Sequence, residues 1–394
     1  MKPLQKKLAQ YTVPQEAKKA GYYPYFTPIS SEQNTEVLID GKKTLMMGSN
    51  SYLGLTNHPK IKEAAIAAIK KYGSGCAGSP FLNGTLDIHI QLQDELAEFL
   101  HKDGVMLFSA GFLANSGVIP CITGRNDYLI FDDRDHASIM EGKQLTFANT
   151  LKYKHNNMED LERVLQKCPI DACKLVVTDG VFSMEGDVAN VPALVDLCAK
   201  YNATLHVDEA HGLGVFGSEG RGTCDHFGML DKVEMVMGTF SKSLASVGGF
   251  IAADFETINY MKHAVRPYIF TASISPASTA SVLAALHIMR SEPERREALW
   301  NIQRYALKCV QDLGFEIGNT SSPIIPIFVR NNEKTFIATR MLLDEGVFIT
   351  PVIAPAVPND ETLIRVALMA THTKEQIDFG VDKIYKTFKK LEII

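Results

Sequence analysis

Two short, mostly apolar runs near the middle of the chain each end abruptly in polar residues, and this feature most constrains the fold. The first run (residues 205–207) is followed by Asp208 and His211, and the second (residues 233–237) leads into the segment GTFSKS, which contains Lys242. The separation of the two runs fits one β-strand–helix–strand unit. In open α/β sheets, ligands bind beyond the carboxyl ends of the strands. The pattern therefore predicts a crevice that receives an acid, an imidazole and an amine together.

The same alternation of apolar strands and helical periodicity extends over much of the chain. Strands are expected at residues 128–131, 149–154 and 174–178, and helices at residues 158–167 and 192–202. Repeated βα units of this kind are typical of a mainly parallel sheet covered by helices. The predicted fold class is therefore α/β, with a smaller α+β domain at the C-terminal end.

Three segments are expected along the chain: an N-terminal arm (residues 1–55), a large domain (56–285) and a C-terminal α+β domain (286–394). Within the arm, a helix is expected around residues 6–20. Within the C-terminal domain, the apolar pattern predicts a single strand over residues 347–352. No internal repeat or flexible linker is evident in the sequence.

Composition and charge narrow the class of protein. The 394 residues are 46% hydrophobic and 22% charged, and the net charge of −5 argues against a nucleic-acid partner, which requires a basic surface. No apolar run approaches the ~18 residues needed to span a bilayer, and no secretory signal is expected at the N-terminus. The seven cysteines are scattered without a Cys-x-x-Cys pair. Neither disulfides nor a metal site is therefore predicted, and a cytoplasmic location is expected.

Pyridoxal 5′-phosphate is the cofactor whose chemistry matches the polar residues at the strand ends. It requires a lysine that binds it covalently, here Lys242, and an acid that pairs with its pyridinium nitrogen, here Asp208. The hydroxyl groups of Thr239 and Ser241, beside the lysine, would donate hydrogen bonds to its phosphate. We therefore expect an enzyme that depends on this cofactor.

The motifs around these residues resemble those of a known family. DEAHGLGVFGSEGRG and GTFSKSLAS-x-GG are similar to segments of the α-oxoamine synthases, which are pyridoxal-phosphate enzymes of the aspartate-aminotransferase type (fold type I). The resemblance runs from GSNSYLGL, beginning at Gly48, to LMATHT, ending at Thr371. Within the family, the lysine segment SKSLASVGG is most similar to the serine palmitoyltransferase branch.

The resemblance implies a role for each residue of the site. Catalytic roles fall on Lys242, His136 and Asp208, with the ring of His136 stacked on the pyridine ring of the cofactor. The residues implied to contact the cofactor are Lys242, Asp208, His211, Thr239, Ser241, Gly111, Phe112, His136, Ser183, Thr271 and Ala272. The residues implied to bind substrate are Asn50, Tyr52, Ser79 and Arg365.

Arg365 lies in the middle of an otherwise apolar predicted strand, where an unpaired charge is costly. Its guanidinium group could form a structural salt bridge, or it could bind the α-carboxylate of a substrate through two parallel hydrogen bonds. The resemblance favours substrate binding. The nearby loop GSGCAGSPFLNG departs from the family at Pro80, where arginine is common, so any role of that arginine cannot be transferred to this chain.

The reaction implied by the resemblance is the decarboxylative condensation of L-serine with palmitoyl-CoA or a similar long-chain acyl-CoA. Gly212, which follows His211, keeps 8-amino-7-oxononanoate synthase or a further α-oxoamine synthase open, because many palmitoyltransferases have serine there. A transaminase or lyase of the same fold would use the same cofactor residues. A catalytically inactive scaffold subunit would have no need of Lys242, so the presence of this lysine argues against a scaffold.

The resemblance also implies a homodimer with shared active sites. Thr271 and Ala272 would reach the cofactor phosphate of the neighbouring subunit from the extended segment FTASISP. The lipid-like acyl substrate adds the expectation of peripheral contact with a membrane.

Overall fold

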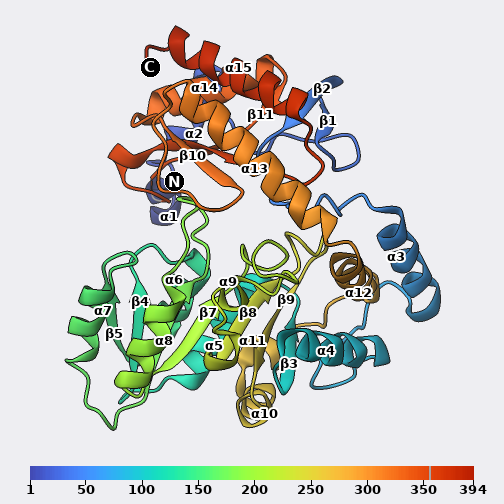
Figure 1. Cartoon of the computed structure of the whole chain (residues 1–394), viewed down its shortest axis with the longest axis vertical. Coiled ribbons are helices and arrows are strands. Elements are labelled where there is room, and N and C mark those ends of the chain that lie inside the picture. Colours follow the sequence, from blue (N-terminus) through green and yellow to red (C-terminus); the bar gives the residue numbers. More distant parts are fainter. Residues whose placement is uncertain (355) are drawn as a thin grey trace.

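A computed structural model describes residues 1–354 and 356–394, and its centre is a seven-stranded sheet (Figure 1). The strand order is β3-β9-β8-β7-β6-β4-β5. The strands are β3 (Gly104–Phe108), β4 (Tyr128–Asp132), β5 (Asn149–Tyr153), β6 (Lys174–Asp179), β7 (Thr204–Asp208), β8 (Met235–Thr239) and β9 (Gly249–Ala253). Strands β4 to β8 run parallel, and β9 pairs antiparallel with both β3 and β8. The predicted, mainly parallel α/β sheet is confirmed.

Helices cover both faces of this sheet, so its strands are buried on both sides. One face carries α5 (Gly111–Ile122), α6 (Ala137–Leu145), α10 (Phe255–Ala264) and α11 (Arg266–Phe270). The other face carries α4 (Asp87–Leu100), α7 (Met158–Leu165), α8 (Val191–Lys200) and α12 (Pro276–Ser291). Successive side chains of a strand point to opposite faces, and accordingly Leu205 and Val207 of β7 pack on the α8 side. His206 and Asp208 therefore point to the α5 side.

The remaining helices of the large unit lie around this core. They are α3 (Pro59–Tyr72), the short helix α9 (Thr223–His226) and the 3₁₀ turn η1 (Leu230–Lys232). Helix α3 packs along α12, and α13 (Glu294–Asp312) then leads from the large unit into the small one (Figure 1). The predicted segment boundary at residue 286 falls inside α12, and the division into three segments stays a prediction.

The smaller unit contains two three-stranded sheets with helices on one side. The first sheet has the order β10 (Ile324–Phe328), β13 (Leu363–Ala367), β12 (Thr350–Val352), and the second has the order β1 (Glu36–Ile39), β2 (Lys42–Met46), β11 (Val347–Phe348). Helices α14 (Asn332–Asp344) and α15 (Lys374–Lys390) and the turn η2 (Asn359–Glu361) complete it. The hairpin β1–β2 thus joins an N-terminal segment to the C-terminal domain.

The single strand predicted over residues 347–352 is wrong, because the chain changes partners at Ile349. Val347 and Phe348 pair in parallel with β2, whereas β12 pairs antiparallel with β13. An uninterrupted apolar run carries no information about which sheet it joins. The tertiary structure divides the segment between two sheets.

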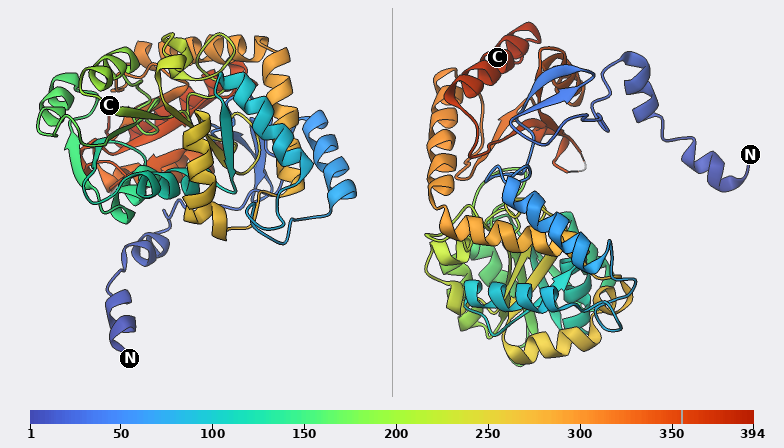
Figure 2. Two further views of the ribbon diagram at one scale, coloured as in Figure 1. Left: turned by 90° about the horizontal axis from the view of Figure 1, so that it is seen from below. Right: turned by 90° about the vertical axis from the view of Figure 1, so that its right-hand side faces the viewer.

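The beginning of the N-terminal arm, which carries its helices, extends away from the rest of the molecule (Figure 2). It contains two helices, α1 (Pro3–Leu8) and α2 (Val13–Ala20), instead of the one predicted. Pro14 has no N–H group to donate to the preceding turn, so a helix cannot run through it without losing a hydrogen bond. In the described part of the chain, no helix combines the length and the apolar character required to cross a membrane.

Candidate active site

A cavity of about 320 Å³ opens at the carboxyl ends of β6, β7 and β8. Residues from distant parts of the chain line it: Ala110, Gly111, Phe112, His136, Ser138, Asp179, Asp208, Ala210, His211, Met237, Thr239, Ser241, Lys242, Val247 and Gly248. Most residues that were predicted to contact the cofactor are therefore brought together. Their individual roles are not tested by this placement and stay predictions.

Lys242 follows β8 and extends into this cavity beside two carboxylates. Burial lowers the pKa of its amine to about 8, and the charges of Asp208 and Asp179 partly oppose that shift. A lysine with a pKa near 8 is partly neutral at physiological pH. Neutral amines are nucleophiles and bases, so this lysine is prepared for both tasks.

Asp208 ends β7 and is held on both carboxylate oxygens. Asn115 Nδ2 donates to Oδ2 at 2.6 Å, and the backbone N–H of Ala210 donates to Oδ1 at 2.8 Å. Such donors stabilise the ionised form of a carboxylate. The side chain is almost wholly buried, so its negative charge is directed at whatever occupies the cavity.

A second carboxyl group, Asp179, lies directly beside Asp208 and was missed from the sequence. The two residues are paired in the register of the parallel strands β6 and β7, so their side chains share one face of the sheet. Burial and the charge of Asp208 raise the pKa of Asp179 well above its ordinary value. Its Oδ2 also accepts the backbone N–H of His136 at 2.7 Å, which fixes the start of the His136 loop.

The opposite end of the cavity has the features of a phosphate site. Helix α5 begins at Gly111, so its free N–H groups and its dipole favour an anion there. A Cβ atom on Gly111 would lie 2.7 Å from Thr239 Oγ1, so only glycine permits this close approach. Thr239 Oγ1 in turn lies 3.0 Å from Ser241 Oγ. With an anion site at one end and the Lys242–Asp208 pair at the other, the residues present fit pyridoxal phosphate.

His211 connects this cavity to the predicted substrate residues. Its Nδ1 lies 2.7 Å from the hydroxyl of Tyr52. Burial and the nearby positive charges of Lys242 and Arg365 lower the pKa of His211 well below its ordinary value. The imidazole is therefore neutral, and the tyrosine hydroxyl can donate to its bare nitrogen.

Arg365 lies in β13 and is held entirely by neutral groups. Its Nη1 donates to Asn50 Oδ1 at 2.9 Å, its Nη2 to the hydroxyl of Tyr52 at 3.4 Å, and its Nε to the carbonyl of Ser183 at 2.6 Å. Among the ion pairs formed by the described residues, none includes Arg365, although its side chain is only 5% exposed. The alternative of a structural salt bridge is thus not observed among the described residues, and the guanidinium group is available for an anionic ligand.

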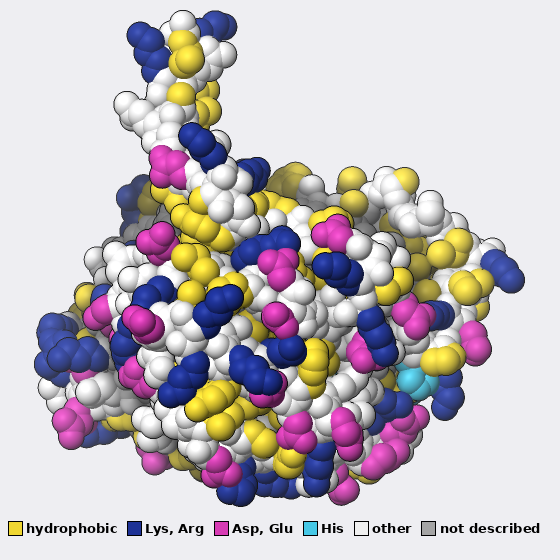
Figure 3. Space-filling model, turned by 90° about the horizontal axis from the view of Figure 1, so that it is seen from above, with side chains coloured by type: hydrophobic (Ala, Val, Ile, Leu, Met, Phe, Trp, Pro, Cys, Tyr) yellow, Lys and Arg dark blue, Asp and Glu magenta, His cyan; other side chains and the backbone are white. Residues whose placement is uncertain are grey.

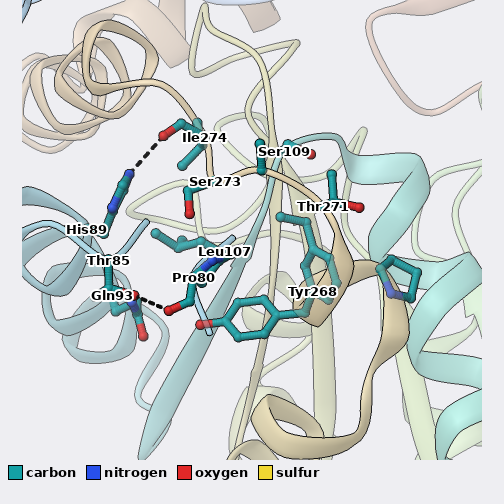
Figure 4. Close-up of a pocket in the computed structure, with 13 residues that line it drawn as sticks. Pro80, Thr85, His89, Gln93, Leu107, Ser109, Tyr268, Thr271, Ser273 and Ile274 are labelled. Carbon is teal, nitrogen blue, oxygen red and sulfur yellow. Dashed lines mark hydrogen bonds between the residues drawn. The ribbon is translucent and has the colours of Figure 1, made fainter. Parts of the chain in front are cut away.

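Ser79, Thr271 and Ala272, which were also predicted for the site, lie elsewhere, and Ser183 does not line the cavity either, since its carbonyl faces Arg365. Thr271 and Ala272 line a separate small pocket with Pro80 (Figure 4). The loop that carries Ser79 reaches the same region, since the backbone N–H of Ser273 donates to the carbonyl of Gly78 at 3.0 Å. Ser79, Thr271 and Ala272 thus do not line the cavity of their own chain. The substrate-binding role of Ser79 is not tested by this placement and stays a prediction.

Sequence reasoning also missed Ser138, which lines the cavity, and Asn115 and His206, which lie behind its wall. All three are buried and hydrogen-bonded to one another or to the predicted residues. Asn115 belongs to the segment SAGFLAN, and His206 occurs in the strand that precedes Asp208. One signal in the sequence could have located His206. Side chains alternate between the two faces of a strand, so His206 must lie on the same face of β7 as Asp208.

Comparison with known proteins agrees with this geometry. The family model for aminotransferase class I and II matches residues 42–384. A serine palmitoyltransferase from Bacteroides ovatus is 61% identical over 391 residues, which is 99% of each chain. A high-resolution structure of a serine palmitoyltransferase with pyridoxal phosphate superposes with a TM-score of 0.95 and 34% identity, covering 100% of both chains.

The second candidate, kept open by Gly212, is represented by more distant proteins. An 8-amino-7-oxononanoate synthase from Thermoanaerobacter pseudethanolicus is 39% identical over 381 residues, or 96% of each chain. The identity to the palmitoyltransferases is higher and covers slightly more of the chain. On this evidence the chain belongs to the serine palmitoyltransferases, a pyridoxal-phosphate-dependent group of α-oxoamine synthases within the class I and II aminotransferase family.

Proposed function

We propose that the chain condenses L-serine with palmitoyl-CoA, or a similar long-chain acyl-CoA, to give 3-ketodihydrosphingosine, CoA and carbon dioxide. The reaction forms a bond between the serine Cα and the acyl carbonyl carbon. It breaks the thioester C–S bond and the bond from Cα to the carboxylate. The observation that carries the proposal is Arg365, a buried guanidinium group without an acidic partner among the described residues, beside a cavity that contains a partly neutral lysine.

Each step makes a demand that one side chain can meet. Bound pyridoxal phosphate supplies an electron sink for the negative charge that develops at the substrate Cα. Lys242 would bind the cofactor covalently and, once released by serine, would take the Cα proton as a general base. Asp208 would keep the pyridine nitrogen protonated, and Arg365 would hold the serine carboxylate. His136 would stack on the ring and orient the group that is lost as carbon dioxide.

Further residues hold the cofactor or the guanidinium group in this proposal. Gly111 and Phe112 would offer backbone N–H groups to the phosphate, and His211 would donate to the phenolic oxygen of the ring. Asn50 and Tyr52 orient Arg365 directly. The backbone carbonyl of Ser183 accepts a hydrogen bond from Nε of Arg365, and this bond fixes the plane of the guanidinium group.

The test of this function is a panel of amino acids against acyl-CoA chain lengths, scored by release of CoA from the purified protein. We expect serine to exceed alanine and glycine, and palmitoyl-CoA to exceed short-chain and pimeloyl thioesters. A preference for alanine with pimeloyl thioester would assign the chain to the 8-amino-7-oxononanoate synthase reaction. Absence of the visible absorption of lysine-bound cofactor, after incubation with pyridoxal phosphate, would point to a scaffold.

We further propose a homodimer in which Ser79, Thr271 and Ala272 complete the active site of the partner subunit. These residues lie outside the cavity of their own chain. The surface around them is apolar, since Leu82 and Phe270 are each 77% exposed. An exposed apolar patch of this kind is characteristic of an interface.

Contact with a membrane surface from the cytoplasm is the remaining part of the proposal. The arm presents the exposed side chains of Leu4 and Leu8 together with Lys6 and Lys7 (Figure 3). Apolar and basic side chains on one segment favour the boundary of an anionic bilayer. Sedimentation with anionic and neutral vesicles tests this, and equal recovery with both would contradict it.

A further inference from the structure

A continuous chain of hydrogen bonds behind the cavity links His136 to Asp208 through Asn115. Asn115, on α5, is fully buried. Its Nδ2 lies 2.6 Å from Asp208 Oδ2 and 2.9 Å from Ser138 Oγ, and its Oδ1 lies 3.0 Å from His206 Nε2. Ser138 Oγ, at the start of α6, lies 2.9 Å from His136 Nδ1. Through Asn115 and Ser138, one hydrogen-bond chain thus reaches both groups that are proposed to act on the cofactor ring.

The chemistry of these groups determines the direction of every bond. A carboxylate only accepts, so the group that faces Asp208 must be the amide nitrogen of Asn115. Its two hydrogens are then used by Asp208 and Ser138. The amide oxygen accepts, and therefore His206 must donate from Nε2. The other nitrogen of His206, Nδ1, has no partner among the described residues and carries no proton, in agreement with burial, which lowers the pKa of His206 to about 4.

The remaining proton positions follow from Ser138. Its hydroxyl accepts from Asn115 and lies 2.9 Å from His136 Nδ1; because the backbone N–H of the same residue also donates to that nitrogen, Nδ1 carries no proton and the hydroxyl must donate to it. The backbone N–H of Ser138 points at the same nitrogen, at 3.2 Å. With two donors facing it, His136 Nδ1 is bare and the ring proton belongs on Nε2. Burial also lowers the pKa of His136, which favours this neutral form.

We propose that Asn115 and Ser138 are positioning residues that fix the tautomer of His136 and hold the Asp208 carboxylate in place through one shared amide. His136 then offers an Nε2–H donor to a substrate oxygen in the cavity and cannot take up a proton at Nδ1. This inference deepens the proposed function and rests on it for the identity of the substrate. The hydrogen-bond chain itself is independent of which amino acid or thioester reacts.

The tautomer can be measured directly in the full-length holoenzyme. Histidine labelled with ¹³C and ¹⁵N, observed by magic-angle-spinning NMR, distinguishes the two neutral tautomers, and loss of a signal in His136→Asn identifies the residue. We expect the Nε2–H form in the unmodified protein and a mixture of tautomers in Ser138→Ala. An Nδ1–H signal for His136 in the unmodified protein would overturn the proposal, whatever Ser138→Ala shows.

A matched control separates the hydrogen-bond chain from the general loss of a buried hydroxyl. Ser116 is buried in α5, and its Oγ donates to the carbonyl of Phe112, at 2.8 Å. Ser116→Ala should leave the His136 signal in the Nε2–H form. If Ser138→Ala and Ser116→Ala give the same spectrum as the unmodified protein, Ser138 does not set the tautomer and the proposal fails.

A second experiment tests the Asp208 end of the hydrogen-bond chain and needs no substrate. Asn115→Ala removes a donor from the Asp208 carboxylate, and loss of such a bond disfavours the charged form. A hydrogen bond to a buried charge is worth roughly a factor of ten or more in binding. We therefore expect the dissociation constant of pyridoxal phosphate, followed by visible absorbance, to rise about tenfold.

An unchanged dissociation constant of pyridoxal phosphate in Asn115→Ala would show that Asp208 does not need the amide, and this result would overturn that half of the proposal. Neither the NMR experiment nor the cofactor-binding experiment measures turnover. If the substrate panel assigned a different thioester, the NMR and cofactor-binding results would still decide the role of the hydrogen-bond chain. The two failures are thus distinguishable.

Discussion

At the scale of single residues, Arg365 is a buried charge whose hydrogen-bond partners, among the described residues, are all neutral. Arg365 is buried among an amide, a hydroxyl and a carbonyl. Burying a charge without a counter-ion costs free energy that the fold must supply. Binding of an anionic substrate offsets part of that cost, which gives the position a physical reason to select a carboxylate.

Arg365→Lys tests this reasoning, because lysine keeps the charge but loses the planar fork of donors. We expect KM for serine to rise by roughly ten- to a hundredfold, as for the loss of a hydrogen bond to a charged group, with little change in KM for palmitoyl-CoA. Steady-state kinetics with each substrate varied in turn is the measurement. Arg330→Lys, at an exposed arginine paired with Glu316, serves as control. Equal changes in both KM values would mean that Arg365 only supports the fold.

The amine of Lys242 should titrate in a visible way. Its pKa of about 8 means that the reactive neutral form accumulates as pH rises through that value. The rate at which the cofactor-free protein binds pyridoxal phosphate should therefore increase between about pH 7 and pH 9. Because Asp208 and Asp179 both raise this pKa, Asp179→Asn should move the midpoint to lower pH. Stopped-flow absorbance measures it, and a midpoint that moves upward contradicts the assignment.

At the scale of elements, the glycine-rich loop between β7 and α9 is held from two sides. Glu209 Oε1 accepts the hydroxyl of Thr223 at 2.7 Å, which draws the end of the loop to the strand that carries Asp208. On its other side, the loop is held by α13. Arg296 Nη2 donates to the carbonyl of Ser218 at 2.7 Å, and Trp300 Nε1 donates to the carbonyl of Val215 at 3.0 Å. Helix α13 thereby connects the small unit to the loop that positions His211.

Gly212 is the tightest point of this loop. A Cβ atom there would overlap Glu209 Oε2. Gly212→Ala should therefore lower the free energy of unfolding by about 1–3 kcal/mol, the usual cost of overpacking a buried site. Urea denaturation measures the change. Gly75→Ala, at a glycine with open space around it, should cost less than about 0.5 kcal/mol, as is usual for surface substitutions. Equal losses in the two variants would show that the Glu209 contact is unimportant.

At the scale of the whole molecule, the residues predicted for the active site are divided between the two units and a separate surface. The cavity is lined by the large unit, whereas Arg365 approaches it from the small unit and Thr271 and Ser79 occupy a different surface. Arg134 adds a direct link between the units, since it forms ion pairs with Glu185 of the large unit at 2.9 Å and with Glu361 of the small unit at 3.0 Å. The position of Arg365 relative to the cavity therefore depends on how the units are joined.

If Thr271 reaches the partner's phosphate, cofactor binding and dimerisation must be linked, because a ligand stabilises the state that binds it. Analytical ultracentrifugation over a dilution series should show tighter dimers with the cofactor than without it. Thr271→Val should raise the cofactor dissociation constant by about tenfold, whereas Thr150→Val, on the edge strand β5, should not. A monomer that retains cofactor and activity would rule out the shared site.

The sequence by itself determined the α/β sheet and most of the cofactor site. Apolar strands lie in the core of the protein. The polar residues that follow them, Asp208 and Lys242, therefore lie at one edge of the sheet. The family motifs then located His136, His211 and the hydroxyls near the lysine. These features depend on local patterns, which a sequence records directly.

The tertiary structure alone decided which partners these residues have. The run at residues 347–352 was divided between two sheets, and the proline-containing arm formed two helices, because strand partners and helix breaks depend on the competing hydrogen bonds of each segment. Asn115, Ser138 and His206 met behind the cavity because α5, α6 and β7 pack on one face of the sheet. Packing likewise decides that no acidic side chain among the described residues pairs with Arg365. Contacts between residues far apart in the chain are set by how elements pack in space, and spacing along the sequence does not encode them.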